Sequence, residues 1–197
     1  MLKIIKYPVK WLLALPLSSK LKHLGANAKL SYPIRVERGK FISIGKNAEI
    51  YSNSFFQAVQ ETPADSPSIT IGNNVRVWSN VQVSAAQQMI IGNDVVLSAN
   101  SFVTDTTHPY ENIDHAPRYN KLKLLSPVVI GDDTWVGRNA IISGCKVGKH
   151  CVVGANAFVN KDVPDYCVVV GNPARIVKRY NFESKMWLKT DKDGNFV

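Results

Sequence analysis

The feature that most constrains this chain is a short aliphatic repeat. An aliphatic residue followed by glycine, with a small or branched residue three positions after the glycine, recurs along most of the sequence. A fixed short period of this kind indicates a solenoid. Within each block the aliphatic anchor returns every six positions, and the anchors are Leu24, Leu30 and Val36; Ile44 and Ile50; Ile71, Val77 and Val83; Ile91, Leu97 and Val103; Ile130, Val136 and Ile142; and Val147, Val153 and Val159.

A period of six fits neither a helix nor simple strand alternation, whose periods are 3.6 and two. It fits a short strand followed by a tight corner. Three such units close a triangular coil of eighteen residues, and stacked coils place each anchor above its equivalent. The Gly, Asn and Asp residues after the anchors tolerate the positive φ angles that tight corners require. The sequence therefore predicts an all-β solenoid whose narrow interior is filled by ladders of Leu, Ile and Val.

The spacing between coils shows where this regularity is interrupted. Two extra residues precede Ile91, and one residue is missing between Ile142 and Val147. Larger insertions fall within the range 55–68 and over the range 109–127. Loops of this length without their own secondary structure are commonly functional, so we expect a role for the insertion at 109–127.

The two ends of the chain differ from the repeats. Residues 1–23 are basic and apolar, and we expect an amphipathic helix that caps the open end of the solenoid. Contact of residues 1–22 with a membrane surface stays open, because five lysines could lie near anionic headgroups. The repeat domain is expected over 24–180, with residues 174–180 as a short helix or an extension. The tail at 181–197 is expected to be weakly ordered at its end.

Composition narrows the classes of partner and the cellular compartment. The net charge is +9, which suggests an anionic partner. No basic stripe interleaved with aromatic residues is present, so nucleic acid is not the expected partner. The three cysteines, Cys145, Cys151 and Cys167, form no CxxC motif and fit a reducing compartment. We expect a cytoplasmic protein, with peripheral attachment at the inner face of the membrane left open.

The segment from Ile130 to Arg179 resembles the C-terminal half of the hexapeptide-repeat acyltransferases. It is most similar to the galactoside, maltose and capsule or lipopolysaccharide O-acetyltransferases. The resemblance implies a left-handed parallel β-helix that works as a homotrimer, with acetyl-coenzyme A in a cleft between subunits and no metal. The terminal motif of the family is matched by Gly154-Ala155, Val159, Lys161-Asp162, Pro164, Gly171, Pro173-Ala174 and Lys178.

His108 is the candidate catalytic base. It ends the coil that starts at Ile91, and the segment FVTDTTHPY is similar to the sequence around the catalytic histidine of sugar O-acetyltransferases. A sugar hydroxyl needs a base to take its proton as it attacks a thioester, and an imidazole can then return that proton to the thiolate. Asp105 or a backbone carbonyl would hold the imidazole. We expect structural roles for His23 and His150, and an acceptor contact from His115 is disfavoured.

Several residues are candidates for the acceptor side. The resemblance assigns Asn80 to acceptor binding, and Trp78 and Tyr110 offer flat faces on which a sugar ring could stack, as do Phe55 and Phe56. For at least half of these four aromatic residues, packing in the core or at an interface is the expected role instead. Where the galactoside and maltose enzymes carry paired aspartates, this chain reads SAA at 84–86. The acceptor is therefore expected to differ from a simple galactoside or maltose.

The coenzyme side requires small residues along an extended arm and cations near the phosphates. The resemblance places Ala155 and Trp135 near the arm. Arg138 matches a coenzyme-contacting position once the one-residue deletion is allowed for. Asn160 and Lys161 follow on the coenzyme side at the next corner. The basic cluster beyond it would pair with the phosphates of the nucleotide end; these residues are Arg175, Lys178 and Arg179.

The expected function is transfer of an acetyl group from acetyl-coenzyme A to a sugar hydroxyl, in a surface polysaccharide or its precursor. N-acetylation of an amino sugar or an antibiotic is an open alternative, and a non-catalytic repeat scaffold is the least favoured alternative. A zinc carbonic anhydrase of the same fold needs three metal-binding histidines at one interface. No HxxxxH pair is present, so that class is disfavoured.

Overall fold

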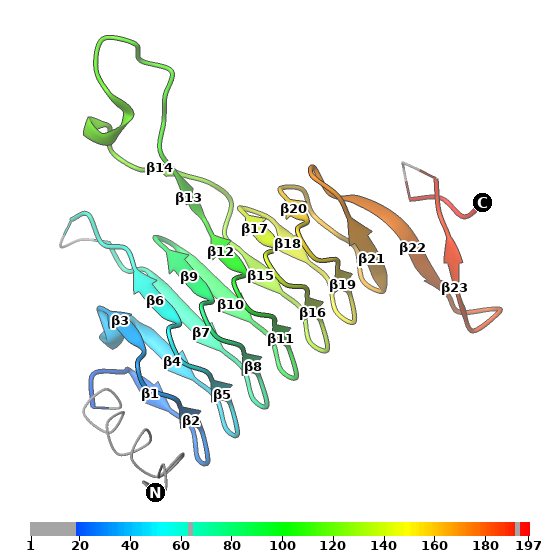
Figure 1. Ribbon diagram of the computed structural model, residues 1–197, viewed down its shortest axis with the longest axis horizontal. Helices are drawn as coiled ribbons and strands as arrows, with labels where there is room; N and C mark the ends of the chain where they lie inside the picture. Colours follow the sequence, from blue (N-terminus) through cyan, green and yellow to red (C-terminus); the bar gives the residue numbers. More distant parts are fainter. Residues whose placement is uncertain (1–18, 63–64, 192–193) are drawn as a thin grey trace, which may run out of the picture.

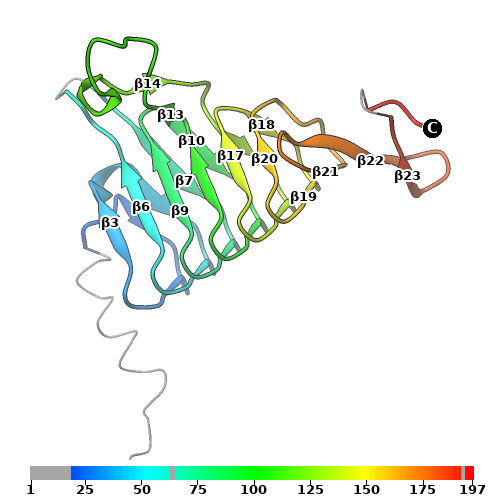
Figure 2. The ribbon, with the colours of Figure 1, turned by 45° about the horizontal axis from the view of Figure 1, so that its top comes forward.

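The computed structural model describes residues 19–62, 65–191 and 194–197. Parallel sheets form the three long faces of a triangular prism, and a long loop projects from one edge (Figures 1 and 2). Most of the helix expected over 1–23, and with it most of the membrane-contacting segment 1–22, lies outside the described residues. Within them, His23 begins the first strand of the prism.

Each coil contributes one strand to each face. The first sheet contains β1 (His23–Leu24), β4 (Ile42–Ile44), β7 (Ser68–Ile71), β10 (Gln88–Ile91), β15 (Val129–Ile130) and β18 (Lys146–Val147). The second contains β2 (Lys29–Leu30), β5 (Glu49–Ile50), β8 (Arg76–Val77), β11 (Val96–Leu97), β16 (Trp135–Val136), β19 (Val152–Val153), β21 (Cys167–Val170), β22 (Arg175–Asn181) and β23 (Met186–Lys189). The third contains β3 (Arg35–Glu37), β6 (Phe55–Ala58), β9 (Gln82–Ala85), β12 (Phe102–Thr104), β17 (Ile141–Ser143) and β20 (Phe158–Val159).

The strand registers confirm the predicted ladders. On the first sheet Ile44 pairs with Leu24 and with Ile71, and the series continues to Ile91 and Ile130. Equivalent series join the anchors of the second and third sheets. Nearly all of these anchors are buried, so the core is a continuous aliphatic column along the prism axis. The burial of this apolar surface is the main driving force for the fold.

One core position was missed from the sequence. Phe56 pairs with Val36 and Val83 on the third sheet and is 1% exposed. It stands six residues after Ile50, where an aliphatic anchor was expected. Phe56 is therefore a core residue and not a surface for sugar stacking, whereas the adjacent Phe55 faces outward and is half-buried.

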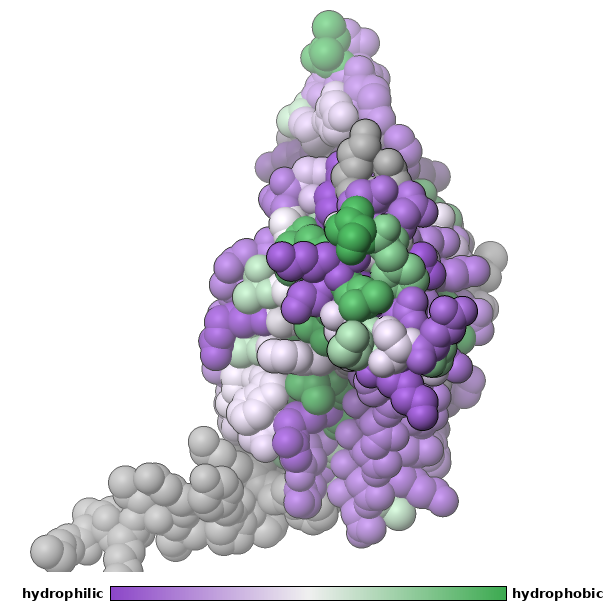
Figure 3. Space-filling model, turned by 90° about the vertical axis from the view of Figure 1, so that its right-hand side faces the viewer, coloured by the Kyte–Doolittle hydropathy of each residue, from purple (hydrophilic) through white to green (hydrophobic). Residues whose placement is uncertain are grey.

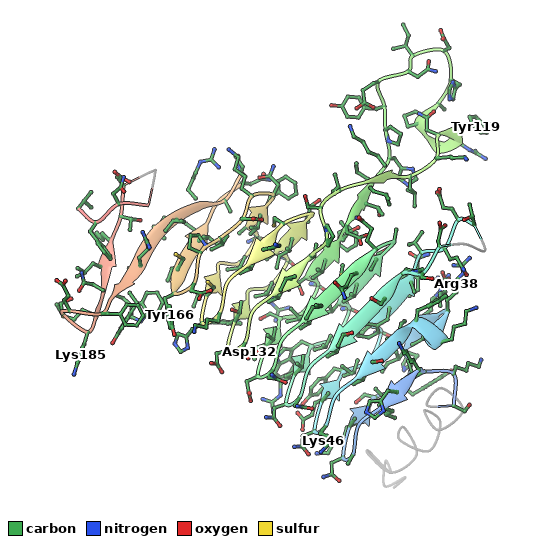
Figure 4. All side chains as sticks on the ribbon, turned by 180° about the vertical axis from the view of Figure 1, so that it is seen from behind. Arg38, Lys46, Tyr119, Asp132, Tyr166 and Lys185 are labelled. Atoms are coloured by element: carbon green, nitrogen blue, oxygen red, sulfur yellow. The ribbon has the colours of Figure 1, made fainter. Side chains whose placement is uncertain are left out.

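Two of the three corners are built alike. The first corner joins the first and second sheets, and the second corner joins the second and third sheets. At both corners the residue three positions after the anchor has a positive φ in every coil except at Leu30, where Pro33 stands, and most of these residues are Asn or Asp. Their side chains bond from coil to coil; at the second corner Asn80 donates to Asn100 over 3.1 Å and Asn100 donates to Asn139 over 3.0 Å. Figure 4 shows Lys46, Asp132 and Tyr166, which lie along the first corner.

The third corner leads from the third sheet to the next coil, and it carries the irregularities. It holds the short 3₁₀ helix η1 (Gly39–Phe41) and the insertion at 59–67. It also holds the long insertion, which begins with β13 (Thr106–Thr107), contains the 3₁₀ helix η2 (Pro117–Tyr119) and returns through β14 (Lys123–Leu124). Strands β13 and β14 pair antiparallel and form the base of this loop.

The C-terminal segment extends the second sheet. β21 is the last parallel strand; β22 then pairs antiparallel with β21, and β23 pairs antiparallel with β22. Residues 174–180 thus form an extension rather than a helix. The hairpin also brings residues 186–189 of the tail into the sheet.

Phe56 and Phe55 offer a matched test of the ladder. Phe56→Ala should lower the free energy of unfolding by about 3–5 kcal/mol, because a buried ring leaves a cavity between two coils. Phe55→Ala should cost about 1 kcal/mol or less, because its ring faces outward. Chemical denaturation followed by circular dichroism measures both changes, and equal losses would contradict the assignment of Phe56 to the core.

Candidate active site

A groove of about 480 Å³ runs along the outer face of the second sheet beside the second corner. Two tryptophans wall it, Trp78 after β8 and Trp135 in β16. Trp78 stacks on Tyr51 with ring centroids 4.8 Å apart, and the Trp135 indole Nε1 donates to Ser98 Oγ over 2.9 Å. Both rings are 41–53% exposed but are held in place by these contacts.

The floor of the groove is made of small residues that follow the anchors of successive coils. Ala99, Gly137, Gly154 and Ala155 all line it. A Cβ added to Gly137 would lie 2.7 Å from the backbone nitrogen of Ala155 and 2.7 Å from the Val153 carbonyl oxygen, so that position requires glycine. Because the floor carries little side-chain bulk, an extended ligand chain can lie close to the backbone.

The structure therefore brings together four residues predicted separately from the sequence: Trp78, Trp135, Arg138 and Ala155. Arg138 is exposed at the edge of the groove and supplies a positive charge there. Ser98 was missed, although it occupies in its coil the position that Trp78 occupies in the preceding one.

His108 lies elsewhere on the same molecule. It is exposed and directly follows β13 at the third corner. Next to it, a notch of about 580 Å³ between the loop base and the third sheet is lined by Thr107, Ser143, Phe158 and Asn160 among others. Asn160, predicted on the coenzyme side, thus lies near the histidine and not in the groove.

Asp105 does not hold the His108 imidazole. Its buried carboxylate accepts hydrogen bonds from the backbone N–H groups of Ala86 and Gln87, each over 2.8 Å. Burial raises the pKa of this carboxyl, and the two backbone donors offset part of that shift. The position of Asp105 three residues before His108 indicated a catalytic pair, but the coil geometry turns its side chain inward, toward the preceding coil.

Asp105 instead fixes the base of the inserted loop. Its carbonyl accepts from Leu125 N–H over 2.7 Å, and the Gln87 side chain donates to the Leu125 carbonyl over 2.7 Å. Further out, Asn120 connects His115, at 2.6 Å, to the Pro109 carbonyl, at 2.9 Å. These contacts define where the chain leaves and rejoins the prism, and therefore where His108 stands.

The remaining predicted residues are spread over the surface. Asn80 occupies the second corner with a φ of 62° and belongs to the amide ladder. Tyr110 is 75% exposed on the loop. Lys161 is exposed beyond β20, and Arg175 is exposed at the start of β22. Lys178 lines a separate pocket with Trp187. Binding roles for these residues stay predictions.

Within residues 19–62, 65–191 and 194–197, no helix is both long and apolar enough to span a bilayer. In the same part of the chain, no three His, Cys, Asp or Glu side chains are placed to hold a metal ion together.

Comparison with known proteins places this geometry in a family. Residues 127–161 match the bacterial transferase hexapeptide family of six repeats. The "Putative acetyltransferase SAR2635" of Staphylococcus aureus (strain MRSA252) is 31% identical over 62% of this chain and 67% of its own length. The chain belongs to the hexapeptide-repeat acyltransferase family. The "Putative lipopolysaccharide biosynthesis O-acetyl transferase WbbJ" of Escherichia coli (strain K12) is 34% identical over 61% of this chain, and the match spans 65% of WbbJ, just under two thirds.

Other members of this acyltransferase family extend the comparison. The galactoside O-acetyltransferase of E. coli (strain K12) is 27% identical over 82% of this chain and 78% of its own length. The crystal structure of AntD, an N-acyltransferase from Bacillus cereus in complex with dTDP and 3-hydroxybutyryl-CoA, superposes with a TM-score of 0.72. That match covers 86% of this chain and 88% of AntD at 18% identity, so it is a likeness of fold. The predicted left-handed parallel β-helix is confirmed.

Asp105→Asn should loosen the loop base of this acyltransferase. An amide presents its NH₂ group to one of the two backbone donors, so one charge-assisted hydrogen bond is lost, at about 1.5–3 kcal/mol. Amide hydrogen exchange should become faster at Ala86, Gln87 and Leu125, whereas Asp114→Asn at the exposed loop tip should leave those amides unchanged. Unaltered exchange in Asp105→Asn would contradict the anchoring role.

The same variant has a predictable pH dependence. Because the pKa of Asp105 is raised in the folded state, the native protein binds more protons than the unfolded chain above pH 3.8. The contribution of Asp105 to the free energy of unfolding therefore falls as the pH rises from 3.8 through the raised pKa, and it is constant above. The difference in stability between wild type and Asp105→Asn should shrink over that window, and a difference that grows would contradict the direction of the shift.

Proposed function

We propose that this protein transfers an acetyl group from acetyl-coenzyme A to a sugar hydroxyl, with His108 as the general base, and that it works as a homotrimer. The acceptor is a surface polysaccharide or its precursor. The observation that carries this proposal is the groove at the second corner, which gathers Trp78, Trp135, Arg138 and Ala155. WbbJ and the galactoside enzyme are both described as O-acetyltransferases, which supports acyl transfer to oxygen.

The groove fits the pantetheine arm of the coenzyme. The arm is long, flexible and largely apolar, and it needs a floor without bulky side chains; Gly137, Gly154 and Ala155 provide one. When bound, the coenzyme supplies the acetyl thioester. Arg138 at the groove edge, with the exposed Lys161 and Arg175, would pair with its phosphates.

The separation of the groove and the base supports the proposal of a trimer. The groove lies at the second corner and His108 at the third, so the two flank opposite edges of the third sheet. The outer face of that sheet carries an apolar stripe in which Phe102 pairs with Ile141 and Ile141 with Phe158. Suppose that three copies pack through this face around a threefold axis. The third corner of one copy then meets the second corner of the next copy. In this packing, His108 of one copy stands beside the groove of its neighbour.

In this arrangement the imidazole of His108 accepts the proton of the sugar hydroxyl while that oxygen attacks the thioester carbonyl. The C–S bond breaks as the tetrahedral intermediate collapses, and the proton passes from the imidazolium to the thiolate. Exposed Trp78 and Tyr110 would stack on the acceptor ring from either side of this junction.

His108→Ala should lower the turnover of acetyl transfer by about 10²-fold or more, the lower end of a general-base contribution. The matched control is His115→Ala in the same inserted loop, which should lose far less. Thiol release from acetyl-coenzyme A measures both, with hydroxyl sugars, amino sugars and capsular fragments as acceptors. If His108→Ala turned over as fast as wild type, His108 would not be the general base. If thiol were released only with amino sugars as acceptors, N-acetylation would be favoured instead.

An active site shared between two copies of the chain leads to a second prediction. His108→Ala and Arg138→Glu should each be inactive or strongly impaired alone, yet a mixture refolded together should regain activity. In mixed trimers, some interfaces combine an intact His108 from one copy with an intact groove from another. For a random 1:1 mixture this restores about one quarter of the interfaces. Activity no higher than the sum of the separate variants would contradict a site built from two copies.

A further inference from the structure

The C-terminal hairpin carries an aromatic cluster that acyl transfer at the groove does not use. Trp187 in β23 packs edge-to-face on Tyr180 of β22, with ring centroids 5.6 Å apart, and stacks on His150, at 6.4 Å and 17°. Tyr180 and Tyr166 in turn contact Phe182 edge-to-face. Figure 4 shows Tyr166 at the end of the first corner, near the hairpin turn that Lys185 marks.

These contacts hold Trp187 as a fixed platform. The ring remains 36% exposed even though it is supported by two neighbouring rings. A supported indole loses little conformational freedom when a ligand stacks on it, so it binds flat rings well. Figure 3 looks onto this end of the molecule, where hydrophobic side chains are interspersed with hydrophilic ones.

A pocket of about 390 Å³ lies beside this platform, and Trp135 and Trp187 both line it. Its floor is apolar and is formed by the outward-facing Val152 and Val168 of the second sheet. Trp135 also lines the groove described above, so the two sites share one indole. A pocket of this size with an apolar floor falls in the range that takes a small ring.

The polar groups at the rim indicate the charge of the ligand. Asp133 and Lys178 carry opposite charges, and His150 lies with its Nδ1 4.0 Å from the Asp133 carboxylate. The carboxylate would repel the phosphates of a nucleotide, and the balanced rim does not favour a polyanion. A carboxylate, an imidazole and an ammonium group together can donate to and accept from several hydroxyls. Indole faces stack on the C–H faces of a pyranose ring, which is neutral and amphipathic.

We propose that this pocket is a sugar-binding subsite that holds a second, neutral residue of the glycan acceptor between Trp135 and Trp187. The inference rests on the proposed function for the identity of the acceptor. Because Trp135 separates the pocket from the groove, a glycan chain held in the pocket can extend past Trp135 and present its reacting residue to the thioester end of the coenzyme arm that lies in the groove. The subsite would favour oligomeric acceptors over single sugars.

The direct test is glycan binding, which does not depend on turnover. Labelled wild-type protein is applied to an array of neutral and acidic bacterial glycans and their single-sugar fragments. We expect binding to neutral oligosaccharides, with Trp187→Ala weakening it by about tenfold, Trp187→Phe by less than about threefold, and Met186→Ala, at an exposed position of β23 outside the aromatic cluster, leaving it unchanged. Absence of glycan binding by wild type, or equal binding by Trp187→Ala, overturns the subsite.

Kinetics separate this proposal from the proposed function. With an array-positive oligosaccharide as acceptor, Trp187→Ala should raise KM for the oligosaccharide about tenfold and leave KM for its single-sugar fragment unchanged. If KM for acetyl-coenzyme A rises instead, the pocket belongs to the coenzyme and the subsite is overturned. If wild type transfers no acetyl group, the proposed function fails, while loss of array binding in Trp187→Ala still supports the pocket as a sugar site.

Discussion

The stacking of each aliphatic anchor on its equivalent one coil away is the interaction on which the rest of this structure depends. A single coil cannot bury its inward side chains, because its interior is only as thick as one strand spacing. Stacked coils bury them completely: Ile71, Val77 and Val83 are each no more than 2% exposed. Because the strands are parallel and in register, a shift of one residue would turn every anchor outward. The register is therefore fixed by the ladders and not by the loops.

This constraint explains why so much of the fold follows from the sequence. The anchors predicted at six-residue spacing are the residues that pair in the sheets, and the Asn and Asp residues that follow them take positive φ values. The prediction missed Phe56 because it searched for aliphatic residues, although the ring fills the same ladder position. The hairpin of β22 and β23 also could not be predicted, since it lies beyond the repeats and is set by antiparallel pairing with β21.

The candidate site was predictable only in part, for a physical reason. A repeat places residues with equal offsets from their anchors on the same face: Arg138 and Ala155 each stand two residues after an anchor, at the second corner. Trp78 and Trp135 each adjoin an anchor of the second sheet, so they line the same groove. The repeat does not specify the tight loop geometry at Asp105, and the short distance in sequence to His108 does not determine where the Asp105 carboxylate points. No sequence pattern marked Trp187 as a site residue, because its position depends on the C-terminal hairpin. For both residues, the packing of neighbouring segments sets where the side chain lies.

The third corner, where the spacing between anchors varies, also explains the position of His108. At the first and second corners, six residues always separate successive anchors, because side-chain ladders such as Asn80 to Asn100 tie each corner to the next. An insertion there would break the ladder in two coils. At the third corner the separation runs from four residues, Val159 to Val163, to 27, Val103 to Ile130. Length can change there without moving any anchor, so a long loop with an exposed imidazole can be added at little cost to the core. A groove at a regular corner and a base at the variable one are thus the arrangement that this repeat permits, and packing between copies is what can unite them.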